Sequence, residues 1–204
     1  KAAIGHVRYS TTGASILLNG QPLLFNSRLG SLALAHNGNL VNAEEIRTQL
    51  ELQGSIFQTD SDSEVIAHLL ARSTTDLDSA LVSALGQVRG AYALVLLTPG
   101  RMLAVRDPHG IRPLVLGQLP AGGWVVASET CALDTVGAKF VREVEPGEVI
   151  SITEQGLEAS SLLPAKKPSF CIFEYIYFAR PDSVFAGGNV HSVRRQMGRL
   201  LAEE

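Results

Sequence analysis

Tight turns join the apolar segments in the second half of this chain, and these short connections constrain its fold more than any other feature. Pro99-Gly100, Gly122-Gly123 and Pro146-Gly147 each separate two apolar or alternating segments. Such short connections join antiparallel strands, because a parallel pair needs a crossover of about a dozen residues or more. The pattern therefore predicts antiparallel strands at 91–98, 102–106, 113–116, 124–128, 139–144 and 148–153.

The first half of the chain has helical periodicity. Apolar residues recur every three or four positions in three segments, and we expect helices at about 43–53, 61–72 and 78–88. Asn42 and Ser61 each stand three residues before a glutamate, Glu45 or Glu64. This spacing predicts a capping box at the start of each of the first two helices.

The grouping of these elements predicts the fold class. Before the helices, 4–9 alternates apolar and polar residues, which predicts a strand, and 14–30 is rich in turn residues. Grouped helices followed by grouped strands are typical of α+β folds, because α/β folds alternate the two. We therefore expect helices packed on antiparallel sheet, with two sheets face to face.

Composition limits the classes of function. The 204 residues are 46% hydrophobic with a net charge of −3, which suits a globular protein and gives no electrostatic reason to expect nucleic-acid or membrane binding. No apolar run in the sequence approaches the ~20 residues of a membrane span. Cys131 and Cys171 are too few for a disulfide framework, so we expect a cytoplasmic protein.

Both ends of the sequence look like interior positions of a longer protein. The first residue is Lys1, with no initiator Met, and the last residues continue a helical pattern without a stop signal. The stretch 164–168 is basic and bounded by prolines, as linkers often are. We expect an internal segment, with one domain at 1–163 and a linker and the beginning of a second domain at 164–204.

A polar stretch at 36–39 follows a short apolar run and contains Asn37-Gly38. Asn-Gly is the strongest short turn signal, so we expect a buried strand at 32–35 followed by a turn. Such a corner presents a side-chain amide and an unencumbered backbone N–H. Two rigid donors of this kind can hold the oxyanion of an acyl-transfer reaction. A plain turn without chemistry is the alternative.

Arg8 and Asp62 are candidate binding residues. Arg8 lies among the apolar residues of the expected first strand, where its guanidinium suits either a substrate carboxylate or an internal salt bridge. Asp62 is expected at the first helical position after Ser61, where it can bind an ammonium group or only complement the helix dipole. Together they would bracket an amino acid whose reacting carbonyl is held by Asn37 and Gly38.

Other polar stretches have simpler interpretations. The segment 106–113 is rich in polar groups, and a turn stapled by an Asp–Arg pair accounts for it. The five histidines lack the spacing of metal ligands. The glycines form neither of the common phosphate-binding loops, and the sequence has no nucleophile elbow.

Three motifs together resemble the glutaminase domain of class II glutamine amidotransferases. They are Gly5-His6-Val7-Arg8-Tyr9-Ser10-Thr11-Thr12-Gly13, His36-Asn37-Gly38-Asn39-Leu40 and Thr59-Asp60-Ser61-Asp62-Ser63-Glu64-Val65. The later stretch Glu174-Tyr175-Ile176-Tyr177-Phe178-Ala179-Arg180-Pro181-Asp182-Ser183 resembles the amidophosphoribosyltransferases within this class. The resemblance implies the N-terminal-nucleophile hydrolase fold, an α-β-β-α sandwich of antiparallel sheets, here incomplete at its N-terminus and followed by the start of a phosphoribosyltransferase domain.

The resemblance implies a role for each candidate residue. Arg8 would bind the α-carboxylate of glutamine and Asp62 its α-ammonium group, while Asn37 and the Gly38 N–H would form the oxyanion hole. The ammonia would pass to phosphoribosyl pyrophosphate and give 5-phosphoribosylamine, in the first step of purine biosynthesis. The family's nucleophile is an N-terminal cysteine. No cysteine precedes Cys131, so we expect the 204 residues alone to be inactive.

The resemblance also implies cofactors and partners. Mg²⁺ would serve the phosphoribosyltransferase half outside this chain, and Cys171 would be either one ligand of a 4Fe-4S cluster or an inert buried cysteine. Glutamine and phosphoribosyl pyrophosphate would be substrates, and the parent protein a homo-oligomer without nucleic-acid or membrane partners. Two alternatives stay open: a class II amidotransferase with another acceptor, and a non-catalytic binding module with the glutaminase fold.

Overall fold

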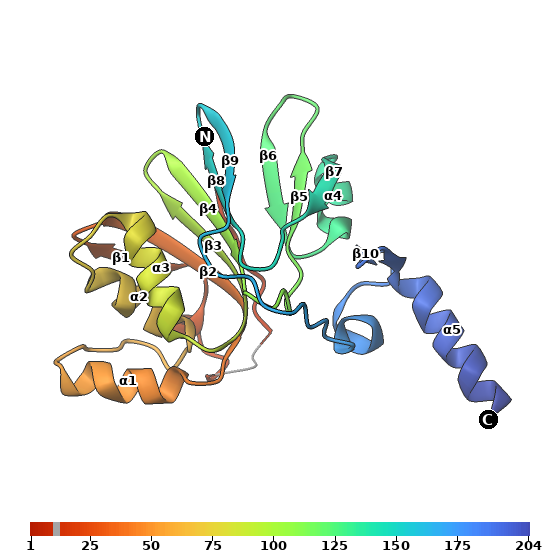
Figure 1. Ribbon diagram of the computed structural model, residues 1–204, viewed down its shortest axis with the longest axis horizontal. Helices are drawn as coiled ribbons and strands as arrows, with labels where there is room; N and C mark the ends of the chain where they lie inside the picture. The colour runs from red at the N-terminus through yellow and green to blue at the C-terminus, as the bar shows by residue number, and fades with distance from the viewer. Residues whose placement is uncertain (10–12) are drawn as a thin grey trace.

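The computed structural model describes residues 1–9 and 13–204 and arranges most of them in four layers (Figure 1). One layer consists of the helices α1 (Ala43–Leu52), α2 (Ser63–Ala71) and α3 (Leu77–Gln87). These helices pack on a six-stranded sheet, whose other face packs on a three-stranded sheet. The outer face of the smaller sheet carries α4 (Thr130–Val136). The expected α-β-β-α sandwich is confirmed.

Both sheets are antiparallel at every strand pair. The larger sheet has the order β1 (Leu23–Ser27), β2 (Gly30–Leu40), β3 (Gly90–Thr98), β4 (Arg101–Arg106), β8 (Val149–Thr153) and β9 (Gly156–Ser160). The smaller sheet has the order β6 (Trp124–Ala127), β5 (Val115–Gln118) and β7 (Lys139–Glu143).

Three hydrophobic clusters fill the three spaces between the layers. The largest lies under the helices and includes Val105 of β4, whereas the preceding residue, Ala104, belongs to the cluster between the two sheets. This alternation follows from the strand geometry, in which successive side chains point to opposite faces. The smallest cluster joins Leu133 of α4 to the outer face of the smaller sheet. Each layer is therefore held by apolar contacts of its own.

The predicted strand at 4–9 is wrong. Within the described residues, 1–9 has no regular secondary structure, and the side chain of Val7 is 97% exposed. A strand needs a neighbouring backbone to pair with, and 1–9 pairs with none of the described strands. The elements β1, β9, β10 (Val184–Phe185), β11 (Gly188–Asn189) and α4 were not expected from the sequence. The other helices and strands lie within two residues of their predicted positions, apart from β2.

The predicted turn at Asn37-Gly38 is also wrong, because β2 continues through this dipeptide to Leu40. Asn37 pairs with Ala93 and Gly38 with Tyr92 across the ladder between β2 and β3. The long pairing with β3 supplies hydrogen-bond partners that a turn would forgo, so the tertiary contact overrides the local turn preference.

Neither predicted capping box forms. The side chain of Asn42 accepts the Arg89 N–H at 2.7 Å and donates to the Gln87 carbonyl at 3.0 Å, so it joins α1 to the end of α3. Helix α2 begins after Asp62, and Glu64 binds the preceding loop rather than Ser61. In each case another partner takes the side chain that the local pattern assigns to the cap: the end of α3 for Asn42 and the loop before α2 for Glu64.

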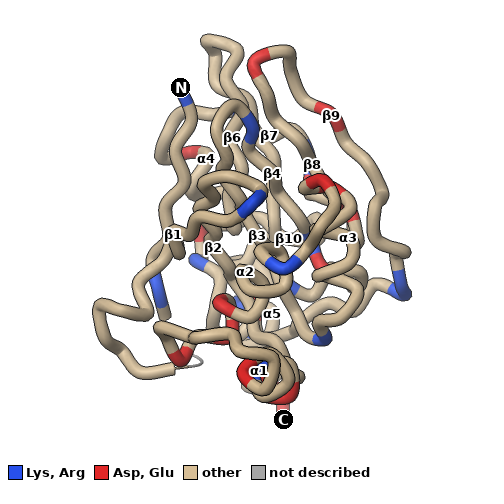
Figure 2. The backbone as a smooth tube through the Cα atoms, turned by 90° about the vertical axis from the view of Figure 1, so that its left-hand side faces the viewer, with Lys and Arg blue, Asp and Glu red and all other residues tan. Residues whose placement is uncertain are grey.

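The C-terminal part leaves the sandwich and projects to one side (Figure 1). It contains a single π-helical turn η2 (Glu174–Phe178), the two-stranded ribbon of β10 (Val184–Phe185) and β11 (Gly188–Asn189), and the predicted last helix α5 (Val190–Glu203). Figure 2 shows acidic and basic residues spread over the backbone. In the described residues, no helix has the length and apolarity to cross a membrane. The domain boundary near 163–168 stays a prediction.

Candidate active site

Gly38 lies in the interior of the larger sheet, where only glycine fits. A Cβ atom at this position would stand 2.0 Å from the Ala91 carbonyl oxygen and 2.7 Å from His36 Nε2. The first of these neighbours is backbone of β3, which cannot move aside without breaking the ladder. The close approach of β3 therefore accounts for the glycine, and it leaves the backbone next to Asn37 without a covering side chain.

The hydrogen-bond partners of the Asn37 side chain identify which end of its amide is the oxygen and which is the nitrogen. Its Oδ1 accepts a hydrogen bond from Arg112 Nη2 at 2.7 Å, and its Nδ2 donates to Ser128 Oγ at 3.0 Å. An amide nitrogen carries two N–H groups, so the second N–H remains available to an acceptor such as an oxyanion. The side chain is half-buried, which leaves it accessible from the site.

Asp62 lies directly beside the same strand. Its Oδ2 accepts the Leu40 N–H at 2.9 Å, and its Oδ1 lies 3.7 Å from His36 Nδ1. Burial alone raises the pKa of Asp62, but hydrogen bonds from His36, Leu40 and Ser63 together with the charge of His36 outweigh burial and lower the pKa below its usual value. Asp62 is therefore held as an anion beside the end of β2, the strand that also carries Asn37 and Gly38.

His36 borders this anion, and His6 lies beside His36. His36 Nδ1 lies 3.0 Å from the hydroxyl of Ser63, which is itself fully buried. Burial is the main cause that lowers the pKa of His6. A hydrogen bond with the His36 backbone raises this pKa, whereas the charges of His36 and Arg8 lower it. The first residues of the chain are thus brought against β2 although they form no strand.

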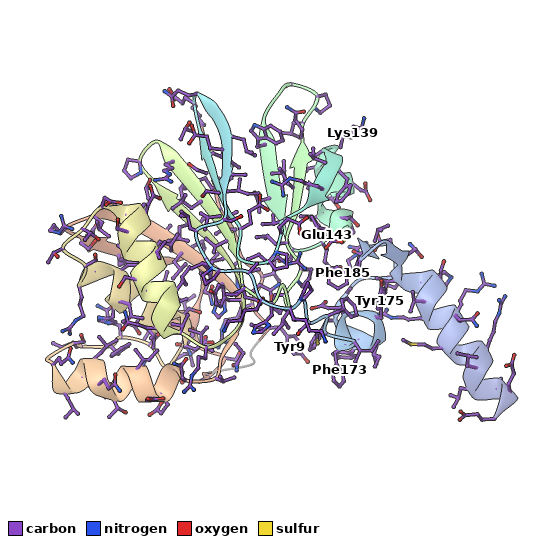
Figure 3. The ribbon with its side chains drawn as sticks, viewed as in Figure 1. Tyr9, Lys139, Glu143, Phe173, Tyr175 and Phe185 are labelled. Carbon is purple, nitrogen blue, oxygen red and sulfur yellow. The ribbon has the colours of Figure 1, made fainter. Side chains whose placement is uncertain are left out.

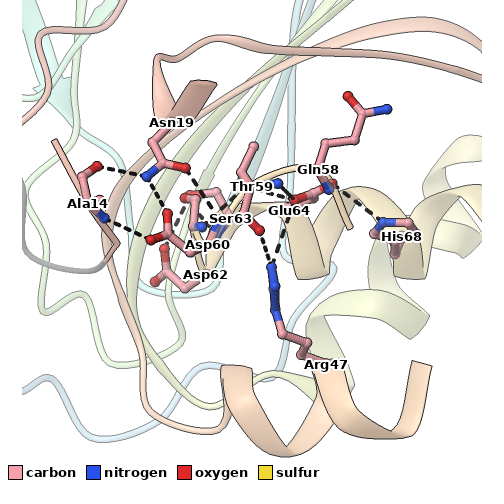
Figure 4. Close-up of polar contacts among 11 residues, drawn as sticks. Ala14, Asn19, Arg47, Gln58, Thr59, Asp60, Asp62, Ser63, Glu64 and His68 are labelled. Carbon is pink, nitrogen blue, oxygen red and sulfur yellow. Dashed lines mark hydrogen bonds and ion pairs between the residues drawn. The ribbon is translucent and has the colours of Figure 1, made fainter. Parts of the chain in front are cut away.

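Arg8 lies next to a different carboxylate, that of Asp60. Its guanidinium donates to the carbonyls of Gly13 and Ala14 at 3.2 and 3.1 Å, and its charge contributes to lowering the pKa of Asp60. The larger causes of this lowered pKa are hydrogen bonds from the Ala14 N–H and from Asn19, which Figure 4 shows converging on Asp60. Asp60 therefore fastens the segment that contains Ala14 and Asn19.

Glu64 holds the segment that carries Asp60 and Asp62. Its carboxylate accepts the N–H groups of Gln58 and Thr59, each at 2.8 Å, and the Thr59 hydroxyl at 2.7 Å (Figure 4). These bonds tie the loop before α2 to the first turn of the same helix. The two aspartates are consequently held on one rigid support.

The sequence identified four site residues, and the structure places them in two groups. Asn37, Gly38 and Asp62 are gathered around the last residues of β2. Arg8 is held by the loop that begins at Gly13. The motif residues 10–12 lie outside the described residues. The roles assigned to these residues by the resemblance stay predictions.

Arg112 and Ser128 are site residues that the sequence did not identify. They bond to the Asn37 side chain from positions 75 and 91 residues away in the chain, so no local pattern could indicate them. The loop before Arg112 is not stapled by an Asp–Arg pair as expected. Asp107, fully buried, accepts the N–H groups of Ile111 and Arg112, while Arg106 donates to the Arg112 carbonyl. Both side chains thus fix the backbone that presents Arg112.

The chain's N-terminal segment also meets its C-terminal part at this place. A hydrogen bond with Tyr177 is the main cause that raises the pKa of Tyr9. Figure 3 shows Tyr9 at the base of the sandwich, on the side where Phe173 and Tyr175 of the C-terminal part lie. The candidate site therefore borders the segment around η2.

Neither cysteine has the surroundings of an activated nucleophile or of a complete metal centre. Cys131 is buried in α4, and burial raises the pKa of its thiol, which disfavours the reactive thiolate. Cys171 is half-exposed before η2. In the described part of the chain, no three His, Cys, Asp or Glu side chains are grouped to hold a metal ion. The two cysteines alone do not fit a four-cysteine iron–sulfur cluster.

Comparison with known proteins identifies the family. The family described as glutamine amidotransferase domain matches residues 6–135. The chain is 52% identical to the amidophosphoribosyltransferase of Bacillus subtilis, over 100% of the chain and 43% of that protein. It is 49% identical to amidophosphoribosyltransferase 2, chloroplastic, of Arabidopsis thaliana, over 99% of the chain and 36% of that protein. The chain thus spans well under half the length of these relatives.

Solved structures agree with this result. The chain superposes on glutamine phosphoribosylpyrophosphate amidotransferase from B. subtilis, complexed with ADP and GMP, with a TM-score of 0.90 and 51% identity, over 98% of the chain and 43% of that structure. A class-II glutamine aminotransferase domain protein from Silicibacter pomeroyi, 21% identical with a TM-score of 0.51 over 70% of each chain, shares the fold. The chain belongs to the glutamine amidotransferase domain family, and it resembles amidophosphoribosyltransferases along its whole length.

Proposed function

We propose that this chain forms most of the glutamine-hydrolysing half of an amidophosphoribosyltransferase. The observation that carries the proposal is the grouping at the end of β2, where Asp62 accepts the Leu40 N–H at 2.9 Å on the same strand as Asn37 and Gly38. A carboxylate kept anionic can bind the ammonium group of an amino acid. Rigid amide donors can stabilise the oxyanion that forms when its side-chain amide is attacked.

Each candidate residue has a distinct role in this proposal. The guanidinium of Arg8 binds the α-carboxylate of glutamine, for which its planar pair of donors is suited. Asp62 binds the α-ammonium group. The second N–H of Asn37 Nδ2 and the backbone N–H of Gly38 donate to the developing oxyanion. Binding of glutamine at Arg8 replaces the carbonyls of Gly13 and Ala14, which are among the present acceptors of that guanidinium.

The nucleophile comes from a cysteine outside these 204 residues. Its thiol adds to the side-chain carbonyl carbon of glutamine, its α-amino group accepts the thiol proton, and the carbon–nitrogen bond breaks as ammonia leaves with that proton. Water then hydrolyses the glutamyl thioester to glutamate and restores the thiol. Cys131, buried with a raised pKa, is unsuited to this step, so the 204 residues alone do not hydrolyse glutamine.

The acceptor is phosphoribosyl pyrophosphate, bound by a phosphoribosyltransferase domain that begins near residue 164 and lies largely outside this chain. Ammonia displaces pyrophosphate and gives 5-phosphoribosylamine. Mg²⁺ belongs to that domain. An iron–sulfur cluster would need three further ligands besides Cys171, and no step proposed here depends on one. The homo-oligomeric state stays a prediction.

The complete protein that carries this segment provides the test. Pyrophosphate release from phosphoribosyl pyrophosphate is measured with glutamine and, separately, with an ammonium salt, and glutamate is measured alongside. We expect both nitrogen sources to support pyrophosphate release. When glutamine is the nitrogen source, the amount of glutamate released should equal the amount of pyrophosphate. Glutamate release that is independent of phosphoribosyl pyrophosphate and supports no pyrophosphate release would instead indicate another acceptor.

A further inference from the structure

Arg112 occupies a position between the proposed oxyanion hole and the C-terminal part of the chain. One end of its guanidinium, Nη2, donates to Asn37 Oδ1 at 2.7 Å. The other end, Nη1, lies 2.7 Å from Glu174 Oε1, and the carbon between them stands 5.2 Å from the centre of the Phe178 ring. One cation thus contacts a candidate catalytic amide, a carboxylate and an aromatic face at once.

The contact with Arg112 determines which end of the Asn37 amide faces the site. A guanidinium has only donors, so it must face the amide oxygen, and the NH₂ group must then point the other way. The reversed amide would set donors against donors and would lose a charge-assisted bond, which is about twice as strong as a neutral one. Arg112 therefore selects the orientation in which Asn37 can donate to an oxyanion.

Arg112 also strengthens the donor that it orients. A positive charge at the amide oxygen draws electron density away from the nitrogen, and neighbouring hydrogen bonds in a chain reinforce one another. One N–H of Asn37 is used by Ser128 Oγ at 3.0 Å, so the reinforcement is directed to the single N–H that remains. The expected benefit appears only when negative charge develops in the transition state.

Glu174 holds Arg112 in this position. Its carboxylate is 2% exposed, and a carboxylate this deeply buried is stable only with a charged or hydrogen-bonded partner. Arg112, whose side chain is 18% exposed, is that cationic partner. Burial raises the pKa of Glu174, and the charge of Arg112 opposes this rise only in part. The carboxylate lies in the π-helical turn η2, a rare geometry that is frequent at functional sites.

We propose that Arg112 is a positioning residue for glutamine hydrolysis, which acts by fixing the side-chain amide of Asn37, and that Glu174 in turn positions Arg112. This inference rests on the proposed function and adds two residues to its site. Neither residue touches the glutamine. Their effect is transmitted through Asn37 alone, and that condition makes the inference testable.

The test is a double-mutant cycle in the complete protein, with Arg112→Met, Asn37→Ala and both together. For Arg112→Met we expect kcat with glutamine to fall roughly 10- to 100-fold, as when a group that orients a metal ligand is removed, with KM changed less than about twofold. In the Asn37→Ala background the same substitution should lower kcat by less than about twofold, because the amide that it orients is gone. Ammonia-dependent synthesis should be unchanged.

Arg142→Met is the matched control. Arg142 pairs with the buried carboxylate of Glu148 through two contacts of 2.7 Å, and neither residue contacts Asn37. This variant loses a similar ion pair and should keep its kcat with glutamine. Glu174→Gln, which keeps the side-chain size, provides a second test if Arg112→Met does not fold. It should lower kcat by several-fold and lose this effect in the Asn37→Ala background.

Each result has one meaning. If Arg112→Met lowers kcat by the same factor with and without Asn37, or if Arg112→Met and Glu174→Gln both leave kcat unchanged, the positioning role is refuted. If the unaltered protein hydrolyses no glutamine, the proposed function fails, and that failure is seen before any variant is compared. If the losses of kcat in Arg112→Met and Asn37→Ala are non-additive and Arg142→Met keeps its kcat, the coupling between Arg112 and Asn37 is established.

Discussion

The carboxylate of Asp62 accepts the backbone N–H of Leu40 at 2.9 Å, and this bond joins the start of α2 to the last residue of β2. Asp62 is 6% exposed, so the bond is shielded from water. It keeps the carboxylate that we assign to the ammonium group of glutamine at a fixed place relative to Asn37 and Gly38. Under the proposed function, one strand positions both the binding and the reacting end of the substrate.

Removal of the groups assigned to the amino acid end should separate the two activities of the complete protein. We expect Arg8→Ala and Asp62→Ala each to abolish most glutamine-dependent synthesis and to preserve ammonia-dependent synthesis, because ammonia does not use the glutamine site. Initial rates with each nitrogen source measure this. Arg28→Ala is the control, since Arg28 also donates to backbone carbonyls, those of Ser73 and Thr75, and should keep both activities.

An equal loss of both activities in Arg8→Ala or Asp62→Ala would contradict the assignment. It would show that these residues maintain the fold on which both halves depend. Thermal unfolding of the same variants distinguishes this outcome, because a residue that only binds substrate leaves the midpoint close to that of the unaltered protein.

Asn37→Ala should reduce turnover far more than glutamine binding. Removal of one oxyanion donor typically lowers kcat by about 10²- to 10³-fold, whereas the ground-state amide gains little from that donor. Steady-state kinetics with glutamine should therefore show a large change in kcat and a small change in KM. Unchanged kcat would remove Asn37 from the oxyanion hole.

The local periodicity was sufficient to predict most elements of this fold. Helices α1 to α3 and the hairpin of β3 and β4 were expected within about two residues, since their patterns are long and their turns short. The missed elements β1, β9, β10, β11 and α4 have two to seven residues each, too few to establish a period. The equally short strands β5 and β6 were expected because the Gly122-Gly123 turn marks them as a pair.

The sequence proposed residues for the site but did not predict the geometry in which the structure places them. Asn37-Gly38 was expected as a turn, yet β3 pairs along β2 and draws the dipeptide into the sheet. Arg112 was not expected at all, because its contact with Asn37 spans 75 residues of sequence. Asp60 was passed over for Asp62, although it is the carboxylate beside Arg8. Contacts between distant segments are decided by the tertiary fold.

Gly38→Ala should destabilise the protein strongly. The added Cβ would lie 2.0 Å from the Ala91 carbonyl oxygen, and the backbone would have to keep a φ of +157°. We expect a loss of about 2 kcal/mol or more in the free energy of unfolding, as for overpacking at a rigid site. Gly86→Ala in α3 is the control. Its Cβ would meet no atom within 4 Å, and replacing a helical glycine should gain up to about 1 kcal/mol.

The lowered pKa of Asp62 predicts how its contribution to stability depends on pH. Because the folded pKa lies below the ordinary value of 3.8, folding favours the ionised form. That stabilisation is fully present above the ordinary value and is lost as the pH falls through the folded value. We therefore expect Asp62→Asn to lower the free energy of unfolding by about 1.5–3 kcal/mol at pH 7, as for a buried hydrogen-bonded charge, and by less near pH 3.

Urea unfolding of both proteins at a series of pH values measures this difference. Other carboxylates titrate in the same window, but they are common to both proteins and cancel in the comparison. Asp134→Asn on the exposed side of α4 should stay within about 0.5 kcal/mol of the unaltered protein throughout. A difference between Asp62→Asn and the unaltered protein that grows as the pH falls would mean that burial, which opposes ionisation, outweighs the hydrogen bonds from Leu40 and His36.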